Sequence, residues 1–209
     1  MLSNGGVIGA RIAGTSPVRM IESGPAAGAL VAGYLARKYN LESLISFDMG
    51  GTTAKACIIQ DGEPLVVGNF EVDRQYLLKP GSGMTVTVPS IDMIEIGAGG
   101  GSIARVDALG LLKVGPDSAG SNPGPACYGR GGREACVTDA DVVLGILDAH
   151  NFLGGDMALN QVGAEQAIQV LATLLDVSLQ EAAFGIFSVV GESMACLLYT
   201  SPSPRDVEE

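Results

Sequence analysis

A short glycine- and threonine-rich stretch between two strand-like segments constrains the fold of this chain most. It reads Asp48-Met49-Gly50-Gly51-Thr52-Thr53, follows the apolar run at 44–47 and precedes a second apolar run at 54–59. Short apolar runs bounded by glycine are typical of β-strands, so this order predicts a strand, a tight turn and another strand.

The predicted turn has the composition of a phosphate-binding loop. Glycine lets the backbone approach an anion closely and turn its N–H groups toward it, and the hydroxyls of Thr52 and Thr53 add donors. Asp48 ends the first strand, where it could hold Mg²⁺ through water, because bound Mg²⁺ keeps several of its waters. We therefore predict phosphate contacts from Gly50, Gly51, Thr52 and Thr53. An ordinary hairpin that begins with a polar aspartate would give the same pattern.

A second glycine-rich stretch, from Ile96 to Ser102, also lies between two strand-like segments. It lacks the helix that follows a dinucleotide-binding fingerprint and the Gly-Lys-Ser/Thr of a Walker loop. A close-packed strand crossing would explain it, and so would a loop that approaches a ligand or a facing lobe. On the second interpretation Gly99, Gly100, Gly101 and Ser102 belong to the nucleotide site. The Gly-, Pro- and Ser-rich segment 115–129 is expected to lie nearby in either case, because long loops inside compact domains are often functional.

Composition narrows the classes of protein and of partner. The 209 residues suffice for one large domain or two small ones, and 47% hydrophobic residues fit a globular protein. A net charge of −11, without Lys/Arg clusters, argues against a nucleic-acid partner. The four scattered cysteines and single histidine make a zinc site improbable and favour a reducing, cytoplasmic setting. No apolar run is long enough to span a bilayer, and we expect no membrane partner.

The remaining pattern predicts strands in the first part of the chain and helices in the second. Expected helices are 26–39, 140–149, 163–175 and 179–196, and expected strands are 43–47, 54–60, 64–70, 84–96 (interrupted at Pro89), 102–106 and 111–114. Asp61-Gly62 predicts a hairpin turn, Thr138 or Asp139 a helix cap, and Ser178 with Glu181 a capping box. This order gives an α/β or α+β layer architecture with a mixed sheet.

Several polar residues have both a structural and a functional interpretation. Lys55 could add charge to a phosphate site, but strand alternation favours a position facing solvent. His150 is expected to act as a cation at a helix C-terminus, and Asp139 and Asp141 as helix-capping rather than metal-binding carboxylates. Cys57 and Cys127 have no adjacent basic residue to activate them, so we expect both to be packing residues.

Taken together, these motifs resemble the hydantoinase/oxoprolinase family, specifically its ATP-binding subunit, hydantoinase A. The similarity extends from Ser3 to about Ala195 and passes through five blocks in order. These blocks are Glu22-Ser23-Gly24-Pro25-Ala26, the Asp48 motif, Ile96 to Ala104, the loop from Gly115 to Gly129, and Val137-Thr138-Asp139-Ala140-Asp141. Five blocks in the right order are more specific than any one of them.

The resemblance implies a fold and an activity. The fold would be one lobe of the actin-like, sugar-kinase and heat-shock ATPase (ribonuclease H-like) type. The activity would be ATP- and Mg²⁺-dependent opening of a cyclic amide such as a hydantoin or 5-oxoproline, or carboxylation of a ketone in related members. Phosphorylation of the substrate oxygen would activate it, with Asp48 acting on the metal, and a B-type subunit or domain commonly completes the reaction.

The chain also departs from the family pattern. Family members carry an earlier Asp-x-Gly-Gly-Thr motif in an N-terminal lobe and a later Gly-Gly-x-Gly-Pro block that holds the adenosine, and both are missing here. We therefore expect 1–196 to be a partial hydantoinase A domain, truncated at both ends and inactive by itself. The Pro- and Ser-rich segment 197–209 is expected to be a non-native or disordered tail.

Two rival functions fit the same residues. A small-molecule kinase or activator ATPase on this fold would phosphorylate a hydroxyl acceptor and release no ring-opened product. A non-catalytic interaction module would keep the activity of the complete complex unchanged when Asp48 is replaced by alanine.

The absence of these two family motifs predicts a low affinity of the chain for MgATP. A charge-assisted hydrogen bond contributes about 1.5–3 kcal/mol net, so losing several of them with the adenine pocket would remove most of the roughly 8 kcal/mol that micromolar binding requires. We expect the 209-residue chain to bind MgATP weakly or not at all in calorimetric titration. Low-micromolar affinity would contradict the fragment interpretation.

Overall fold

The computed structural model describes residues 1–72 and 81–200, which divide into two compact units. Unit 1 comprises Met1–Asp48 and Lys55–Glu95, and unit 2 comprises Met49–Ala54 and Ile96–Tyr199. The architecture is mixed α/β, as the sequence predicts: an N-terminal helical segment is followed by the strands, and the strands are followed by further helices.

Unit 1 is built on a small sheet covered by one long helix. The sheet has the order β1–β2–β3, with β8 also paired to β2, and two further two-stranded pairs, β4–β7 and β5–β6, belong to the same unit. The strands are β1 (Ser43–Met49), β2 (Ala54–Gln60), β3 (Glu63–Pro64), β4 (Val66–Val67), β5 (Phe70–Val72), β6 (Met84–Val86), β7 (Ser90–Ile91) and β8 (Ile94–Ile96). A short helix α1 (Ala10–Thr15), a 3-10 turn η1 (Pro17–Met20) and the helix α2 (Ser23–Tyr39) precede them.

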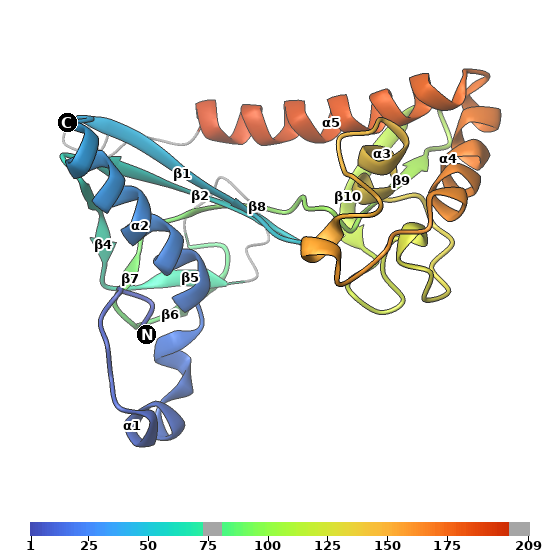
Figure 1. The fold of residues 1–209 in the computed structure, drawn as a ribbon. Helices are drawn as coiled ribbons and strands as arrows, with labels where there is room; N and C mark the ends of the chain where they lie inside the picture. The colour runs from blue at the N-terminus through green and yellow to red at the C-terminus, as the bar shows by residue number, and fades with distance from the viewer. Residues whose placement is uncertain (73–80, 201–209) are drawn as a thin grey trace. The chain divides into compact units, whose positions relative to one another are not determined.

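Helix α2 packs against the sheet through a face of small residues (Figure 1). Alanines recur at helical spacing along this face and are all buried, and they meet buried residues of β2 and β7. Because the face is small, the backbones come very close: a Cβ added at Gly33 would lie 2.6 Å from the carbonyl oxygen of Gly62 in the β2–β3 turn. In that turn both Asp61 and Gly62 have positive φ, as in the predicted two-residue hairpin.

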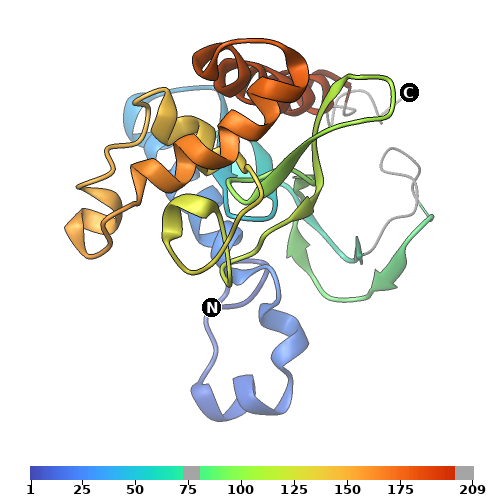
Figure 2. The same cartoon turned by 90° about the vertical axis from the view of Figure 1, so that its right-hand side faces the viewer.

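Unit 2 places helices beside the β9–β10 hairpin (Figure 2). β9 (Ser102–Val106) and β10 (Leu112–Ser118) are antiparallel, with an irregularity between Val114 and Ser118. The helices are α3 (Val137–Val143), α4 (Gln161–Leu175) and α5 (Leu179–Thr200), with 3-10 turns η2 (Ala126–Tyr128) and η3 (Phe152–Gly155). α4 contacts α3, η2 and β9, and its buried Ala164 belongs to a core cluster with Cys127, Val142 and Leu159.

The capping box before α5 is confirmed. The backbone N–H of Ser178 donates to the Glu181 carboxylate at 2.9 Å, and the N–H of Glu181 donates to the Ser178 hydroxyl at 3.2 Å. α5 continues to Thr200, and residues 201–209 of the expected tail lie outside the described residues.

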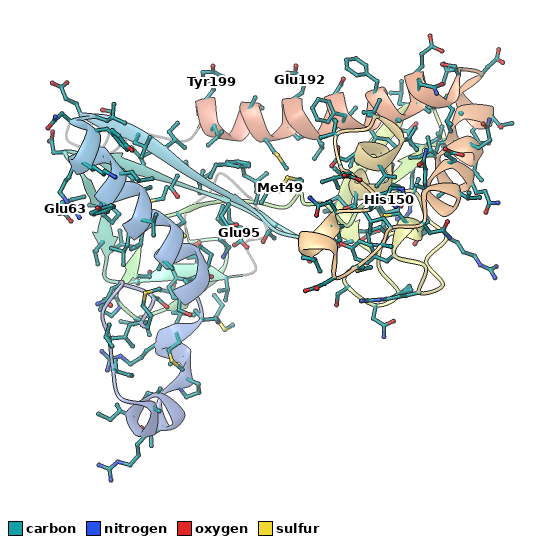
Figure 3. All side chains as sticks on the ribbon, in the orientation of Figure 1. Met49, Glu63, Glu95, His150, Glu192 and Tyr199 are labelled. Carbon is teal, nitrogen blue, oxygen red and sulfur yellow. The ribbon has the colours of Figure 1, made fainter. Side chains whose placement is uncertain are left out.

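The expected helix 140–149 is wrong at both ends. α3 begins at Val137, with Cys136 rather than Thr138 or Asp139 as its N-cap, because the Asp139 carboxylate reaches back to the Cys136 N–H at 2.9 Å. It ends at Val143, and Gly145 follows with a φ of 73°. His150 (labelled in Figure 3) therefore lies in a later turn, exposed, and does not serve as a cation at the helix end.

The expected strand 64–70 is also wrong as a single element. β3 ends at Pro64, which has no N–H to continue a ladder with β2. Val66 then pairs with Ile91 of β7, and Phe70 begins β5, which pairs with β6.

No single helix among the described residues is long and apolar enough to cross a membrane. The segments Gln161–Leu175 and Leu179–Cys196 meet the length and hydropathy criteria only together, across a bend of 92°.

Two glycines on α2 give a matched test of this packing. Gly33→Ala should destabilise the chain by about 1–3 kcal/mol, because its Cβ would overlap a backbone oxygen that cannot move independently of its turn. Gly28→Ala meets only the Ser46 hydroxyl at 3.9 Å and should be neutral or stabilise by up to about 1 kcal/mol through helix propensity. Urea denaturation followed by far-UV circular dichroism measures both. Equal stability of the two variants would contradict the close approach.

Candidate functional site

The predicted phosphate turn has the expected strand–turn–strand setting. It connects β1 to β2, and the N–H of Gly50 donates to the carbonyl of Thr53 at 2.9 Å, which closes the turn. Within the described part of the chain, the N–H groups of Gly51, Thr52 and Thr53 donate to no protein acceptor. Three consecutive backbone donors are therefore available beside two hydroxyls.

The second glycine motif lies directly against this turn. The N–H of Gly100 donates to the carbonyl oxygen of Gly50 at 3.0 Å, and that of Gly101 to the carbonyl oxygen of Gly51 at 2.6 Å. A Cβ added at Gly99 would lie 2.6 Å from the Gly50 oxygen and 2.8 Å from backbone atoms of Gly51 and Thr52. The two motifs thus pack backbone on backbone, which only residues without a side chain permit.

This contact defines what the second motif does in the structure. The amides of Gly100 and Gly101 bind protein carbonyls, so they hold the turn instead of pointing to a free anion. Ser102 is fully buried, and its hydroxyl accepts the N–H of Gly99 at 2.9 Å. These residues support the conformation of the turn by hydrogen bonds to its carbonyl oxygens and to each other. A direct contact between any of them and a nucleotide stays a prediction.

The expected loop 115–129, whose first residues form the end of β10, also reaches the turn, as predicted. The Ala119 N–H donates to the Gly101 carbonyl at 2.9 Å, and the Ser118 hydroxyl lies 3.4 Å from the Gly51 carbonyl. Sequence reasoning placed this loop near the site but did not single out Ser118. The available signal was its position at the start of the Gly- and Pro-rich segment.

Helix α3 supports the second motif from its other side. The N–H and the hydroxyl of Thr138 both donate to the carbonyl oxygen of Gly100, each at 2.8 Å. Next to it, the fully buried Asp139 carboxylate accepts N–H bonds from Ala126, Cys127 and Cys136 at 3.2, 2.7 and 2.9 Å. Asp139 is thus a capping and loop-binding carboxylate, and Thr138 is a site residue that sequence analysis missed.

Asp48 is the last residue but one of β1, and its side chain is exposed. It forms no ion pair or hydrogen bond with any side chain that the structure describes, so its carboxylate is open to water or a cation. Within residues 1–72 and 81–200, no three His, Cys, Asp or Glu side chains are grouped to hold a metal ion. A single water-bridged carboxylate is compatible with Mg²⁺, which takes most of its ligands from phosphates and water.

The expectation that Lys55 faces solvent is wrong. Its side chain is only 16% exposed, and its Nζ lies 2.5 Å from the Glu22 carboxylate and 3.7 Å from that of Glu95 (Glu95 is labelled in Figure 3). Alternation along β2 turns Lys55 to the same side as the buried Cys57 and Ile59, which pack with α2. The charge of Lys55 is therefore neutralised inside unit 1.

Burial controls the ionisation of the other candidate groups. Burial first, and then the charge of Asp92, raise the pKa of Cys57 to about 11. Burial, followed by interactions with Asp139, raises the pKa of Cys127 still further. Both thiols stay protonated at neutral pH and pack in the core, as expected. Burial alone raises the pKa of Asp141 to about 6, and this carboxylate has no partner side chain in the described residues.

The comparison with protein families matches the hydantoinase/oxoprolinase family over residues 1–202. The chain belongs to this family. It is 44% identical over 199 residues to an uncharacterized protein of Methanocaldococcus jannaschii and 40% identical over 193 residues to the caprolactamase alpha subunit of Pseudomonas jessenii. Among solved structures, nucleotide-free acetone carboxylase superposes with a TM-score of 0.79 at 29% identity.

These relatives are much longer than the chain. The alignments cover 93% of this chain and 29% of the archaeal protein, and 92% of this chain and 26% of the caprolactamase subunit. The acetone carboxylase match covers 96% of this chain and 27% of that chain. The family's fold therefore extends over the chain, whereas the chain spans about a quarter of the length of these relatives.

The contact between the two glycine motifs can be tested with two glycines of the same loop. Gly99→Ala should destabilise unit 2 by about 1–3 kcal/mol, because its Cβ would overlap three backbone atoms of the turn. A Cβ at Gly97 meets nothing within 4 Å, so Gly97→Ala should change stability little. Thermal and urea unfolding by circular dichroism compare them. A Gly99→Ala variant as stable as Gly97→Ala would mean that the loops are not in contact.

Proposed function

We propose that this chain is the phosphate-binding part of an ATP-dependent enzyme that opens cyclic amides. The observation that carries the proposal is the β1–β2 turn, where three successive N–H groups have no acceptor within the described residues. The N–H groups of Gly100 and Gly101 bind the carbonyl oxygens of Gly50 and Gly51 and hold the turn in its conformation. The N–H groups that have no protein acceptor are therefore arranged without the help of a ligand. Such preorganised donors suit the oxygens of a nucleotide phosphate.

The residues divide the work of binding MgATP. Gly51, Thr52 and Thr53 would donate to phosphate oxygens, with Gly50 closing the turn. Asp48, exposed at the end of β1, would hold Mg²⁺ through water. Lys55 stays with Glu22 and contributes no charge to the phosphates.

Bound MgATP would transfer its γ-phosphoryl group to the amide oxygen and leave as ADP, which opens the amide carbon to attack by water. The ring C–N bond would then break, and hydrolysis would release phosphate. The protein's part is then positioning and charge neutralisation, which the fixed N–H groups and the Asp48 carboxylate can provide. The chain spans about a quarter of the length of its relatives. The cyclic-amide pocket, the adenosine pocket and a B-type partner subunit would belong to the complete enzyme.

Ring opening is placed first because the family model that matches the chain is that of hydantoinases and oxoprolinases. Sequence identity does not separate the two reactions, since the caprolactamase alpha subunit and the acetophenone carboxylase gamma subunit of Aromatoleum aromaticum are each 40% identical to the chain. The TM-score of 0.79 to acetone carboxylase keeps ATP-dependent carboxylation as the second candidate. Both reactions would use the same turn and differ in the substrate that receives the phosphoryl group.

The test uses the full-length polypeptide that contains this segment, purified with its partner subunit. We expect ATP-dependent ring opening of hydantoin, 5-oxoproline or caprolactam, and an at least roughly hundredfold lower rate for Asp48→Ala, because Mg²⁺ loses the carboxylate that would hold it through water. Phosphate release and ring-opened product are measured together. Asp156→Ala, which removes an exposed carboxylate of unit 2, is the control and should keep the wild-type rate.

The rivals give different products. Phosphorylated substrate without ring opening would indicate a kinase, and bicarbonate-dependent product would indicate a carboxylase. An unchanged rate for Asp48→Ala would refute the assignment of this turn to the nucleotide.

A further inference from the structure

We propose that Thr138 is a positioning residue for the phosphate turn. The inference rests on the function proposed above, and it assigns to the Thr138 hydroxyl the task of holding the turn in its binding conformation through Gly100. Thr138 does not itself touch the turn, so its effect on nucleotide must pass through that glycine.

Thr138 donates two hydrogen bonds to one carbonyl oxygen, that of Gly100. Both its backbone N–H and its hydroxyl donate to the Gly100 oxygen at 2.8 Å, and the side chain is 5% exposed. Two donors on one oxygen fix the orientation of that peptide group more tightly than one donor does. A Cβ at Gly100 would lie 2.7 Å from the Thr138 hydroxyl, so this arrangement also requires glycine at position 100.

Gly100 is in turn hydrogen-bonded to the β1–β2 turn. The N–H of Gly100 donates to the Gly50 carbonyl, and the neighbouring N–H of Gly101 donates to the Gly51 carbonyl. Gly100 is therefore held on both sides, by Thr138 through its carbonyl and by the turn through its amide. With the Gly50 and Gly51 carbonyls engaged on this side, the next N–H groups of the turn have no protein acceptor in the described chain.

Thr138 is itself held in place by the bonds of its neighbour in α3. Its neighbour Asp139 is completely buried and accepts N–H bonds from Ala126, Cys127 and Cys136. These bonds tie the first turn of α3 to the η2 loop, so the Thr138 hydroxyl has a fixed place within unit 2. The resulting chain of bonds runs from Asp139 and Thr138 through Gly100 to Gly50.

The experiment separates this role from a general contribution to stability. Thr138→Val keeps the side-chain shape and removes the hydroxyl, and Thr138→Ser keeps the hydroxyl. Thr173→Val is the matched control, because the Thr173 hydroxyl donates at 2.9 Å to the Gln169 carbonyl on the exposed side of α4, away from the turn. Each variant is made in the 209-residue chain and in the full-length enzyme.

In the chain, amide hydrogen exchange by NMR reports the Gly100 and Gly101 N–H groups without nucleotide. We expect exchange roughly three- to tenfold faster in Thr138→Val, as the loss of one hydrogen bond implies, with near wild-type exchange in Thr138→Ser and Thr173→Val. In the full-length enzyme, the KM for ATP should rise by a similar factor in Thr138→Val with a smaller change in kcat, and Thr138→Ser should restore it.

Unchanged exchange at Gly100 and Gly101 in Thr138→Val would overturn the proposal, whatever the kinetics show. Faster exchange with an unchanged KM would overturn the role in nucleotide binding. If the full-length protein uses no ATP, the proposed function fails, while faster exchange would still establish that Thr138 positions the turn.

Discussion

The structure of the candidate site depends on one contact, the packing of the Gly99–Gly101 backbone against the turn at Gly50–Thr52. Two hydrogen bonds, of 3.0 and 2.6 Å, join them, and a methyl group at position 99 or 101 would overlap backbone atoms of Gly51. Such proximity is unavailable to any other residue type, because every L-amino acid other than glycine carries a Cβ. The high glycine content of these two segments therefore has a packing cause within unit 2.

The same contact sorts the backbone donors of the site into two groups. The amides of Gly50, Gly99, Gly100 and Gly101 all bind protein acceptors and fix the shape of the loops. Those of Gly51, Thr52 and Thr53 have no protein acceptor in the described residues. A rigid support beneath a row of open donors is the arrangement that anion binding favours, because the donors need little reorganisation when the ligand arrives.

Membership of the hydantoinase/oxoprolinase family gives these donors a chemical context. Caprolactamase and acetone carboxylase act on different substrates, yet this segment has counterparts in both, over 92% and 96% of its length. A segment shared between a lactamase and a ketone carboxylase fits a role in handling the nucleotide common to their reactions.

Local sequence patterns correctly predict the two glycine motifs, the strand–turn–strand around Asp48, the small-residue face of α2 and the capping box at Ser178, because each depends on neighbours in the chain or on helical spacing. The element predictions are wrong at 64–70 and 140–149. At 64–70 the strand is divided because Val66 pairs with Ile91 of β7. At 140–149 the helix begins earlier because Asp139 accepts N–H bonds from Cys136 and from the η2 loop. Local pattern fails again at Lys55, whose side chain is mostly buried against Glu22, the N-cap residue of α2. The contacts of Gly100 with Gly50 and with Thr138 are visible in the folded chain alone, because these bonds join residues about 40 to 50 positions apart. No local periodicity encodes which distant carbonyl an amide will meet.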